Sequence, residues 1–261
     1  MWAAIAADPA PLRFVILGDR TGEAIPGVYE QVWREMEAEN PAFVVTVGDT
    51  IQGTHDATAP EEWQEVEQLL KPYRRFPIYL AAGNHDIWSL ASEQLFREHA
   101  GHAPNYSFDS GPVHCTVLDN SRSDQLPAEA MAFLEQDLKV HAAQPVKLVV
   151  SHRPFWLLNV AMQNPDFEFQ RLMRQYSVQY VVAGHIHQML HLSQQGVTYI
   201  SMPSAGGHLR ASSKYQDGWF FGHALVEVQG GAFKFQIEEA KAPHGQGRIT
   251  QPKDWGMTGL R

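Results

Sequence analysis

The stretch Leu80-Ala81-Ala82-Gly83-Asn84-His85-Asp86 joins an apolar run to three consecutive polar side chains. The run from Ile78 to Ala82 has the length and composition of a strand that is buried on both faces. Gly83 ends the run, and an amide, an imidazole and a carboxylate follow at once. In α/β sheets, ligands bind beyond the carboxyl ends of such strands. This stretch therefore predicts a strand whose end carries functional groups.

Four other segments repeat this pattern of an apolar run followed by candidate metal ligands. The runs at 14–17, 43–47, 148–151 and 180–184 lead into Asp19, Asp49, His152 and the pair His185-Ile186-His187, respectively. Residues i and i+2 of an extended chain share a face, so both imidazoles of the pair can address one centre. Because strands of this kind end at a common edge, the five segments predict a single metal site.

The order of the segments predicts one α/β domain with mixed sheets and helices outside them. Strands and helices alternate in the first two thirds of the chain, and hairpin-like strands follow. We expect an N-terminal extension at 1–11, the domain at 12–240 and an irregular tail, rich in Gly and Pro, at 241–261. The expected helices are 26–40, 60–70, 88–99, 126–140 and 166–176, and the later expected strands are 105–108, 113–118, 197–202, 219–228 and 232–237.

Composition is that of an ordinary globular protein, with 44% apolar and 19% charged residues among 261. The net charge of −9 argues against nucleic-acid binding, and no apolar run approaches the roughly 20 residues of a membrane span. Cys115 lies in a strand-like segment, which favours a buried, inert thiol. The N-terminal residues lack the basic region of a signal peptide, so we expect a soluble, cytoplasmic protein, or an exported one if a signal peptide preceded Met1.

Oxygen and imidazole donors without a thiolate suit Mn²⁺, Fe or Zn²⁺, and this many donors can hold two ions. Two cations about 3.5–4 Å apart can clamp a phosphoryl group and deprotonate a shared water. His85 would then protonate the leaving oxygen, and Asp86 would orient His85. Motifs of other hydrolases are absent from the sequence, including His-Glu-x-x-His and Gly-x-Ser-x-Gly.

The order of these motifs over about residues 12–205 resembles that of the calcineurin-like metallophosphoesterase family. The resemblance implies a four-layer α/β/β/α sandwich of two mixed sheets with a dinuclear metal centre, where a hydroxide bridging the two ions attacks phosphorus. It also implies the following roles: Asp49 bridges the two ions, Asp19 and His187 hold one of them, Asn84, His152 and His185 hold the other, and His85 is the proton donor.

One position departs from the family pattern. The family usually has histidine two residues after the first aspartate, and this chain has Thr21, within Asp19-Arg20-Thr21-Gly22. This resembles a bacterial branch with Gly-Asp-Arg-Thr-Gly at the same place. Because a hydroxyl is a poorer ligand than an imidazole, we expect the ion held by Asp19 and His187 to bind more weakly or to complete its shell with water.

Three further residues are candidates for substrate contacts, namely Arg20, Thr21 and Arg153. A bidentate arginine suits a phosphoryl oxygen, although surface salt bridges are an equally good interpretation of both arginines. Trp156 is a candidate wall of the substrate cleft. The remaining histidines are expected to be structural or superficial: His55, His99, His102, His114, His141, His191, His208, His223 and His244.

The sequence thus predicts a metal-dependent hydrolase of phosphate mono- or diesters, acting on a small phosphorylated substrate or a phosphoprotein. An alternative is a non-catalytic metal-binding interaction protein, in which Thr21 marks a degraded first site. A nucleotide phosphodiesterase is a third hypothesis. His85 favours catalysis, because a structural metal has no use for a proton donor.

Overall fold

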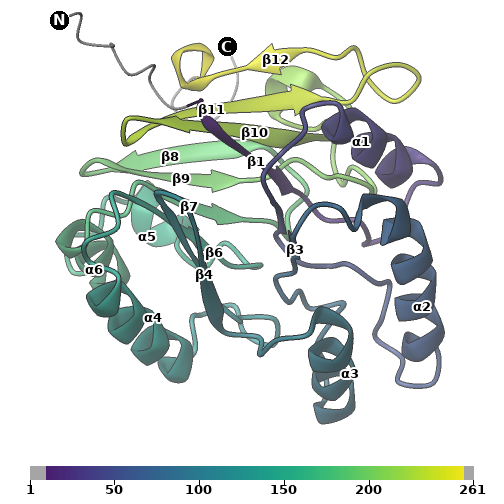
Figure 1. Ribbon diagram of the computed structural model, residues 1–261, viewed down its shortest axis with the longest axis horizontal. Coiled ribbons are helices and arrows are strands. Elements are labelled where there is room, and N and C mark those ends of the chain that lie inside the picture. The colour runs from purple at the N-terminus through teal and green to yellow at the C-terminus, as the bar shows by residue number, and fades with distance from the viewer. Residues whose placement is uncertain (1–9, 256–261) are drawn as a thin grey trace, which may run out of the picture.

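Two six-stranded β-sheets lie face to face in the computed structural model, which describes residues 10–255 (Figure 1). The first contains, in spatial order, β12 (Ile249–Thr250), β11 (Ala232–Glu239), β10 (Gly222–Gln229), β1 (Leu12–Leu17), β2 (Val44–Thr46) and β3 (Ile78–Tyr79). The second contains β4 (Tyr106–Ser110), β5 (Val113–Val117), β6 (Val146–Val150), β7 (Tyr180–Ala183), β9 (Val197–Ser201) and β8 (Leu190–Gln194). Both are mixed: β1, β2 and β3 are parallel, as are β5, β6, β7 and β9, and the other pairs are antiparallel.

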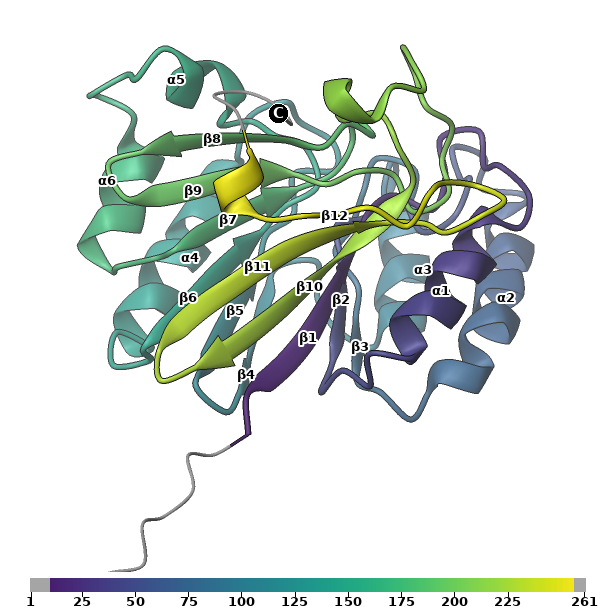
Figure 2. The same cartoon turned by 90° about the horizontal axis from the view of Figure 1, so that it is seen from above.

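Helices cover the outer face of each sheet (Figures 1 and 2). The first sheet is covered by α1 (Val28–Glu37), α2 (Ala59–Leu70) and α3 (Leu90–Ala100). The second is covered by α4 (Ala128–Val140), α5 (Leu157–Ala161) and α6 (Glu168–Gln175). The layers therefore follow the order α/β/β/α, which confirms the expected four-layer sandwich.

Strand β1 shows why the sequence forms this sandwich. Its side chains alternate between two apolar cores, as the pleat of a strand requires. Phe14 and Ile16 pack between the two sheets, whereas Val15 and Leu17 pack against the helices. All four side chains are fully buried. A continuous apolar run is thus the pattern of a strand with a core on each face.

Three short elements differ from the sequence prediction. The edge strand β8 lies where no strand was expected, and α5 lies where no helix was expected. The segment from 241 onward was expected to be irregular, yet β12 pairs with β11 through Ile237–Thr250 and Glu238–Ile249. These elements span only two to five residues each. Such segments are too short for periodicity to reveal, because pairing with neighbours decides their structure.

Several sequence predictions concern the ends of the chain and its solubility. Residues 1–9, most of the expected N-terminal extension, and residues 256–261, the end of the expected tail, lie outside the described residues. Within 10–255, no helix is long and apolar enough to span a membrane. Cys115 is a buried, unpaired thiol in the core between the sheets, as expected, and burial raises its pKa.

Candidate metal centre

The candidate ligands gather where strands of both sheets end. Asp19 and Asp49 follow β1 and β2, and His152 and the pair His185/His187 follow β6 and β7. Two groups of donor atoms each lie within 4.8 Å of one another: Asp49, His152 and His185 form one, and Asp19, Asp49 and His187 form the other. Asp49 belongs to both groups, so its carboxylate lies between two potential ion positions.

The first group of donors also includes the amide oxygen of Asn84. The His152 Nε2 atom lies 3.0 Å from Asn84 Oδ1, 3.3 Å from Asp49 Oδ1 and 3.2 Å from His185 Nδ1. Donor atoms of Asn84, His185 and Asp49 thus all lie within 3.3 Å of His152 Nε2.

The second group is centred on Asp19. The His187 Nε2 atom lies 3.4 Å from Asp19 Oδ2, and both side chains are fully buried. The other oxygen of the shared carboxylate, Asp49 Oδ2, is buried and has no hydrogen-bond partner among the residues that the structure describes. A buried carboxylate oxygen is costly to leave unsatisfied, and a bound cation would satisfy it. The donor set therefore fits two cations.

Backbone carbonyls hold two of the imidazoles in a defined orientation. His152 donates from Nδ1 to the carbonyl of Val47 at 2.9 Å, and His187 donates from Nδ1 to the carbonyl of His208 at 2.8 Å. Each ring therefore presents Nε2 toward the carboxylates. Such contacts behind the ligands fix the tautomer and the ring orientation at metal sites.

The loops that carry these ligands have unusual backbone conformations. Asp49, His185 and His187 have φ values of 56°, 71° and 60°, a region that non-glycine residues seldom adopt and that clusters at functional sites. A Cβ atom added at Gly83 or at Gly184 would lie 2.2 Å from a carboxylate oxygen, of Asp49 and Asp19 respectively. Glycine at these two strand ends therefore makes room for the acidic ligands.

Burial and neighbouring charges shift the pKa values of three candidate ligands, Asp49, His152 and His185. Burial disfavours the ionised form of Asp49, but the charge and hydrogen bond of His152 outweigh it and hold the pKa of Asp49 low. Burial opposes protonation of His152, yet Asp49 raises the pKa of His152 to about 9. Burial, with the charges of His152 and Arg153, lowers the pKa of His185 to about 4. A cation would displace the proton from His152, since metal ligation requires a neutral imidazole.

His85 lies next to this centre, but the structure contradicts the role expected for Asp86. The backbone N–H of His85 donates to Asp49 Oδ1 at 2.9 Å, and its Nδ1 donates to the backbone carbonyl of Gln52. The buried Asp86 carboxylate instead accepts the backbone N–H groups of Thr50, Ile51 and Gly83. Asp86 therefore fixes the loops on either side of the site, and the carbonyl of Gln52 orients His85.

The hydroxyl of Thr21 points to Gln52, to which it donates a hydrogen bond. The sequence interpretation missed Gln52, which lies in a loop without a motif. Arg20 donates to the carbonyl of Thr50 at 3.0 Å, so its guanidinium is held beside the loop after β2. These contacts join both residues, of which Thr21 is fully buried, to the loop that follows Asp49.

Two further arginines lie close to the imidazoles. Arg153 Nη1 lies 3.5 Å from His185 Nε2 and donates to Asp124 Oδ1 at 2.6 Å. Arg210 Nη2 lies 3.5 Å from His187 Nε2. Arg153 was predicted because it follows a ligand in the sequence, whereas no motif indicated Arg210.

Trp156 does not line a cleft: it is fully buried and packs on Tyr199 with ring centroids 5.1 Å apart. Its expected role as a substrate wall is therefore wrong. The reason is that the segment after His152 turns inward to form α5, and the tryptophan fills the core beneath it.

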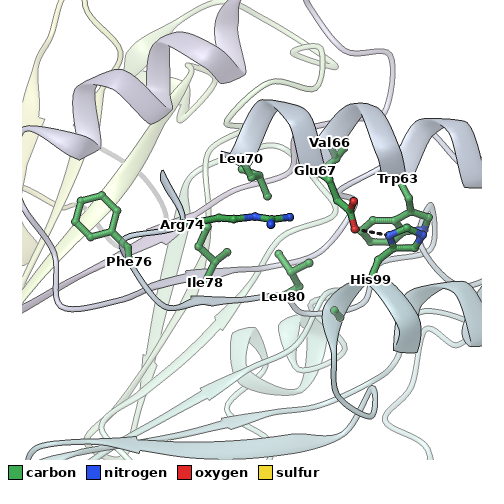
Figure 3. Close-up of a pocket in the computed structure, with 10 residues that line it drawn as sticks. Trp63, Val66, Glu67, Leu70, Arg74, Phe76, Ile78, Leu80 and His99 are labelled. Carbon is green, nitrogen blue, oxygen red and sulfur yellow. Dashed lines mark hydrogen bonds and ion pairs between the residues drawn. The ribbon is translucent and has the colours of Figure 1, made fainter. Parts of the chain in front are cut away.

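A cavity of about 240 Å³ lies away from the candidate metal centre, between α2, α3 and β3 (Figure 3). Its walls are mostly apolar, and the Arg74 side chain extends between Leu70 and Leu80. At one end, His99 Nδ1 lies 2.7 Å from Glu67 Oε1. None of the candidate metal ligands lines this cavity.

An α/β/β/α sandwich with carboxylates and imidazoles at its strand ends is the architecture expected of a metallophosphoesterase. The family model for calcineurin-like phosphoesterases matches residues 12–189. Since the match covers more than half of the chain, the protein belongs to the calcineurin-like phosphoesterase family, and the resemblance in sequence motifs is confirmed.

Several known proteins are similar to this chain. Purple acid phosphatase 23 of Arabidopsis thaliana is 28% identical over 198 residues, which are 68% of this chain and 41% of that protein. A 3',5'-cyclic-nucleotide phosphodiesterase of Nostoc sp. is 26% identical over 158 residues, 57% of this chain and 58% of that protein. A solved purple acid phosphatase from yellow lupin seeds has a TM-score of 0.71 at 16% identity, covering 94% of this chain and 54% of that one. The chain thus spans about half the length of these relatives.

Proposed function

We propose that this protein hydrolyses phosphate esters with the help of two divalent cations. The observation that carries the proposal is the position of the Asp49 carboxylate, which belongs to both groups of donor atoms and keeps one buried oxygen without a hydrogen bond. A single carboxylate shared by two such groups is what a pair of cations a few ångströms apart requires. Family membership supports the same activity.

The residues fit two cations of the Mn²⁺, Fe or Zn²⁺ class, because the donors are oxygen and imidazole nitrogen. Asp19 and His187 would hold one ion, and Asn84, His152 and His185 would hold the other, with Asp49 between them. When bound, the ions would neutralise phosphoryl oxygens and lower the pKa of a water.

The side chains of this chain would handle the proton and the phosphoryl group. His85 donates from Nδ1 to Gln52, so its Nε2 is the atom that would pass a proton to the leaving oxygen. The guanidinium groups of Arg20 and Arg153 are anchored by Thr50 and Asp124, and from there they would contact phosphoryl oxygens.

For the substrate we propose a small phosphorylated molecule or a phosphoprotein rather than a nucleic acid or a membrane lipid. The net charge of −9 opposes binding to an extended polyanion, whereas two cations would attract a single phosphate. The relatives named above are called purple acid phosphatases and a 3',5'-cyclic-nucleotide phosphodiesterase, which supports a phosphate ester as the substrate of this chain.

The test compares hydrolysis of p-nitrophenyl phosphate and bis-p-nitrophenyl phosphate with added Mn²⁺, Fe²⁺ or Zn²⁺. We expect metal-dependent turnover of at least one ester and its loss in the Asp49→Asn variant, with an unchanged circular dichroism spectrum as the control for folding. No turnover by the folded protein with any of these metals would disprove the proposal. It would favour a non-catalytic metal-binding protein, an alternative supported by the Thr21 hydroxyl turning to Gln52.

A further inference from the structure

A second group of potential ligands lies at the opposite end of the second sheet. Asp109 and His114 are cross-strand partners in the β4–β5 hairpin. His114 is near the amino end of β5, which runs parallel to β6, whereas the candidate metal centre lies beyond the carboxyl ends. Asp137 and His141 come from the last turn and C-cap of α4. Two carboxylates and two imidazoles thus meet between a hairpin and the end of a helix.

Three of these side chains face one another. His114 Nδ1 lies 2.7 Å from Asp109 Oδ1, and His141 Nε2 lies 4.0 Å from Asp109 Oδ2. Donor atoms of Asp109, His114 and His141 all lie within 4.8 Å of one another. The Asp109 side chain is 43% exposed, so solvent reaches this group.

The fourth residue, Asp137, holds both imidazoles from behind. Its buried carboxylate lies 2.9 Å from His114 Nε2 and 3.1 Å from His141 Nδ1, and the Nδ1–H of His141 donates to the backbone carbonyl of Asp137 at 2.9 Å. Ser107 and Thr116 also donate to it, at 2.7 and 2.6 Å. Each ring therefore directs its other nitrogen toward Asp109. A carboxylate or a backbone carbonyl behind each ligating histidine is the arrangement that orients imidazoles at metal sites.

The hydrogen bonding of His114 requires a positive charge, either on the ring itself or beside it. This imidazole is fully buried and has a carboxylate oxygen within 2.9 Å of each nitrogen. A neutral imidazole carries only one N–H, so the contact between Nδ1 and Asp109 needs either a second proton or a metal ion. The two carboxylates of the cluster also leave a charge that a divalent cation would balance.

We propose that Asp109, His114 and His141 bind a divalent cation of the Zn²⁺, Ni²⁺ or Cu²⁺ class, with Asp137 as the residue that positions both imidazoles. Two imidazoles and a carboxylate are donors that suit these ions, and three protein ligands leave a position for water or a further ligand. The rings now stack with centroids 4.0 Å apart at 17°. Binding would therefore shift the His141 ring, which is 28% exposed at the helix end, out of this stack and bring its Nε2 closer than the present 4.0 Å to Asp109 Oδ2.

The test counts Zn²⁺ ions per full-length chain by native mass spectrometry and measures their affinity by calorimetry. We expect His141→Ala and Asp109→Asn each to bind one ion fewer than the wild type, or to bind that ion at least tenfold more weakly. His99→Ala is the matched control, because His99 also pairs with a carboxylate but lies outside the cluster. Its stoichiometry should equal that of the wild type.

Asp109→Asn should not disturb folding, since the Asp109 side chain is 43% exposed. Circular dichroism checks the folding of both variants. Hydrolysis of phosphate esters with Mn²⁺ should be unchanged in both, so the result does not depend on the proposed function. An equal Zn²⁺ count and affinity in the wild type and both folded variants would overturn the proposal and leave a proton between Asp109 and His114.

Discussion

The hydroxyl of Thr21 donates a hydrogen bond to the side-chain oxygen of Gln52, whose backbone carbonyl accepts one from His85 Nδ1. Gln52 therefore contacts both the residue at which this chain departs from the family pattern and the candidate proton donor. Thr21 supplies no imidazole to the ion position beside Asp19 and His187, and its hydroxyl is directed to Gln52 instead.

We expect two Mn²⁺ ions to bind with unequal affinity, because the position beside Asp19 has one imidazole fewer than the family pattern provides. Calorimetric titration of the metal-free protein should resolve two binding events. His187→Ala should remove the weaker event and His185→Ala the tighter one. Two events of equal affinity in the wild type would contradict this assignment.

His85→Ala should lower kcat by about 10²–10⁴-fold for esters with an alkoxide leaving group, the range typical of general acid catalysis. The loss should be much smaller for p-nitrophenyl phosphate, because p-nitrophenolate leaves without a proton. Steady-state kinetics with both esters measure the difference. Gln52→Ala is the matched control: it keeps the backbone carbonyl that orients His85, so it should not show this dependence on the leaving group.

Arg153→Ala should raise KM for a phosphate ester by about tenfold with a smaller change in kcat, because one charge-assisted contact to the phosphoryl group is lost. Asp124→Ala should raise KM less, since it frees the guanidinium from its anchor without removing it. An unchanged KM in Arg153→Ala would show that the arginine only binds Asp124.

Asp86→Ala should destabilise the protein by about 3 kcal/mol or more, because it leaves three buried backbone N–H groups without an acceptor. Urea unfolding of the metal-free protein measures the loss. Asp56→Ala removes an exposed acceptor of one hydroxyl and should change the free energy of unfolding by less than about 1 kcal/mol. Similar values for the two variants would argue against the structural role of Asp86.

His223 should make the stability depend on pH. Burial and the charge of Lys241 lower its pKa from 6.5 to about 4, and neither ring nitrogen has a hydrogen-bond partner within residues 10–255. From pH 6.5 down to 4, the unfolded chain binds a proton that the folded chain does not. Stability therefore falls as the pH falls through this window, by at most about 1.4 kcal/mol per pH unit from this group.

The measurement is urea unfolding of the metal-free wild type and His223→Gln at several pH values between 4 and 8. The variant should lack this part of the slope and match the wild-type slope above pH 7. Parallel curves over the whole range would show that His223 titrates normally.

The fold and the candidate ligands were accessible to sequence reasoning because local patterns carry them. Apolar runs such as Phe14 to Leu17 mark strands with a core on each face, and each candidate ligand directly follows such a run. The part played by Asp86 was not accessible, although it is next to His85. Its hydrogen bonds go to Thr50 and Ile51, which come from a different loop.

The sequence by itself determined which segments become buried strands, that their ends carry oxygen and imidazole donors, and hence the family. Only the tertiary structure decided that Asp49 lies between two donor groups, that Gln52 rather than Asp86 orients His85, and that Asp109, His114 and His141 meet at the far end of a sheet. The physical reason is how far apart along the chain the interacting residues lie. Burial patterns follow from neighbours along the chain, whereas a contact of a few ångströms between distant segments depends on how two sheets and their helices pack.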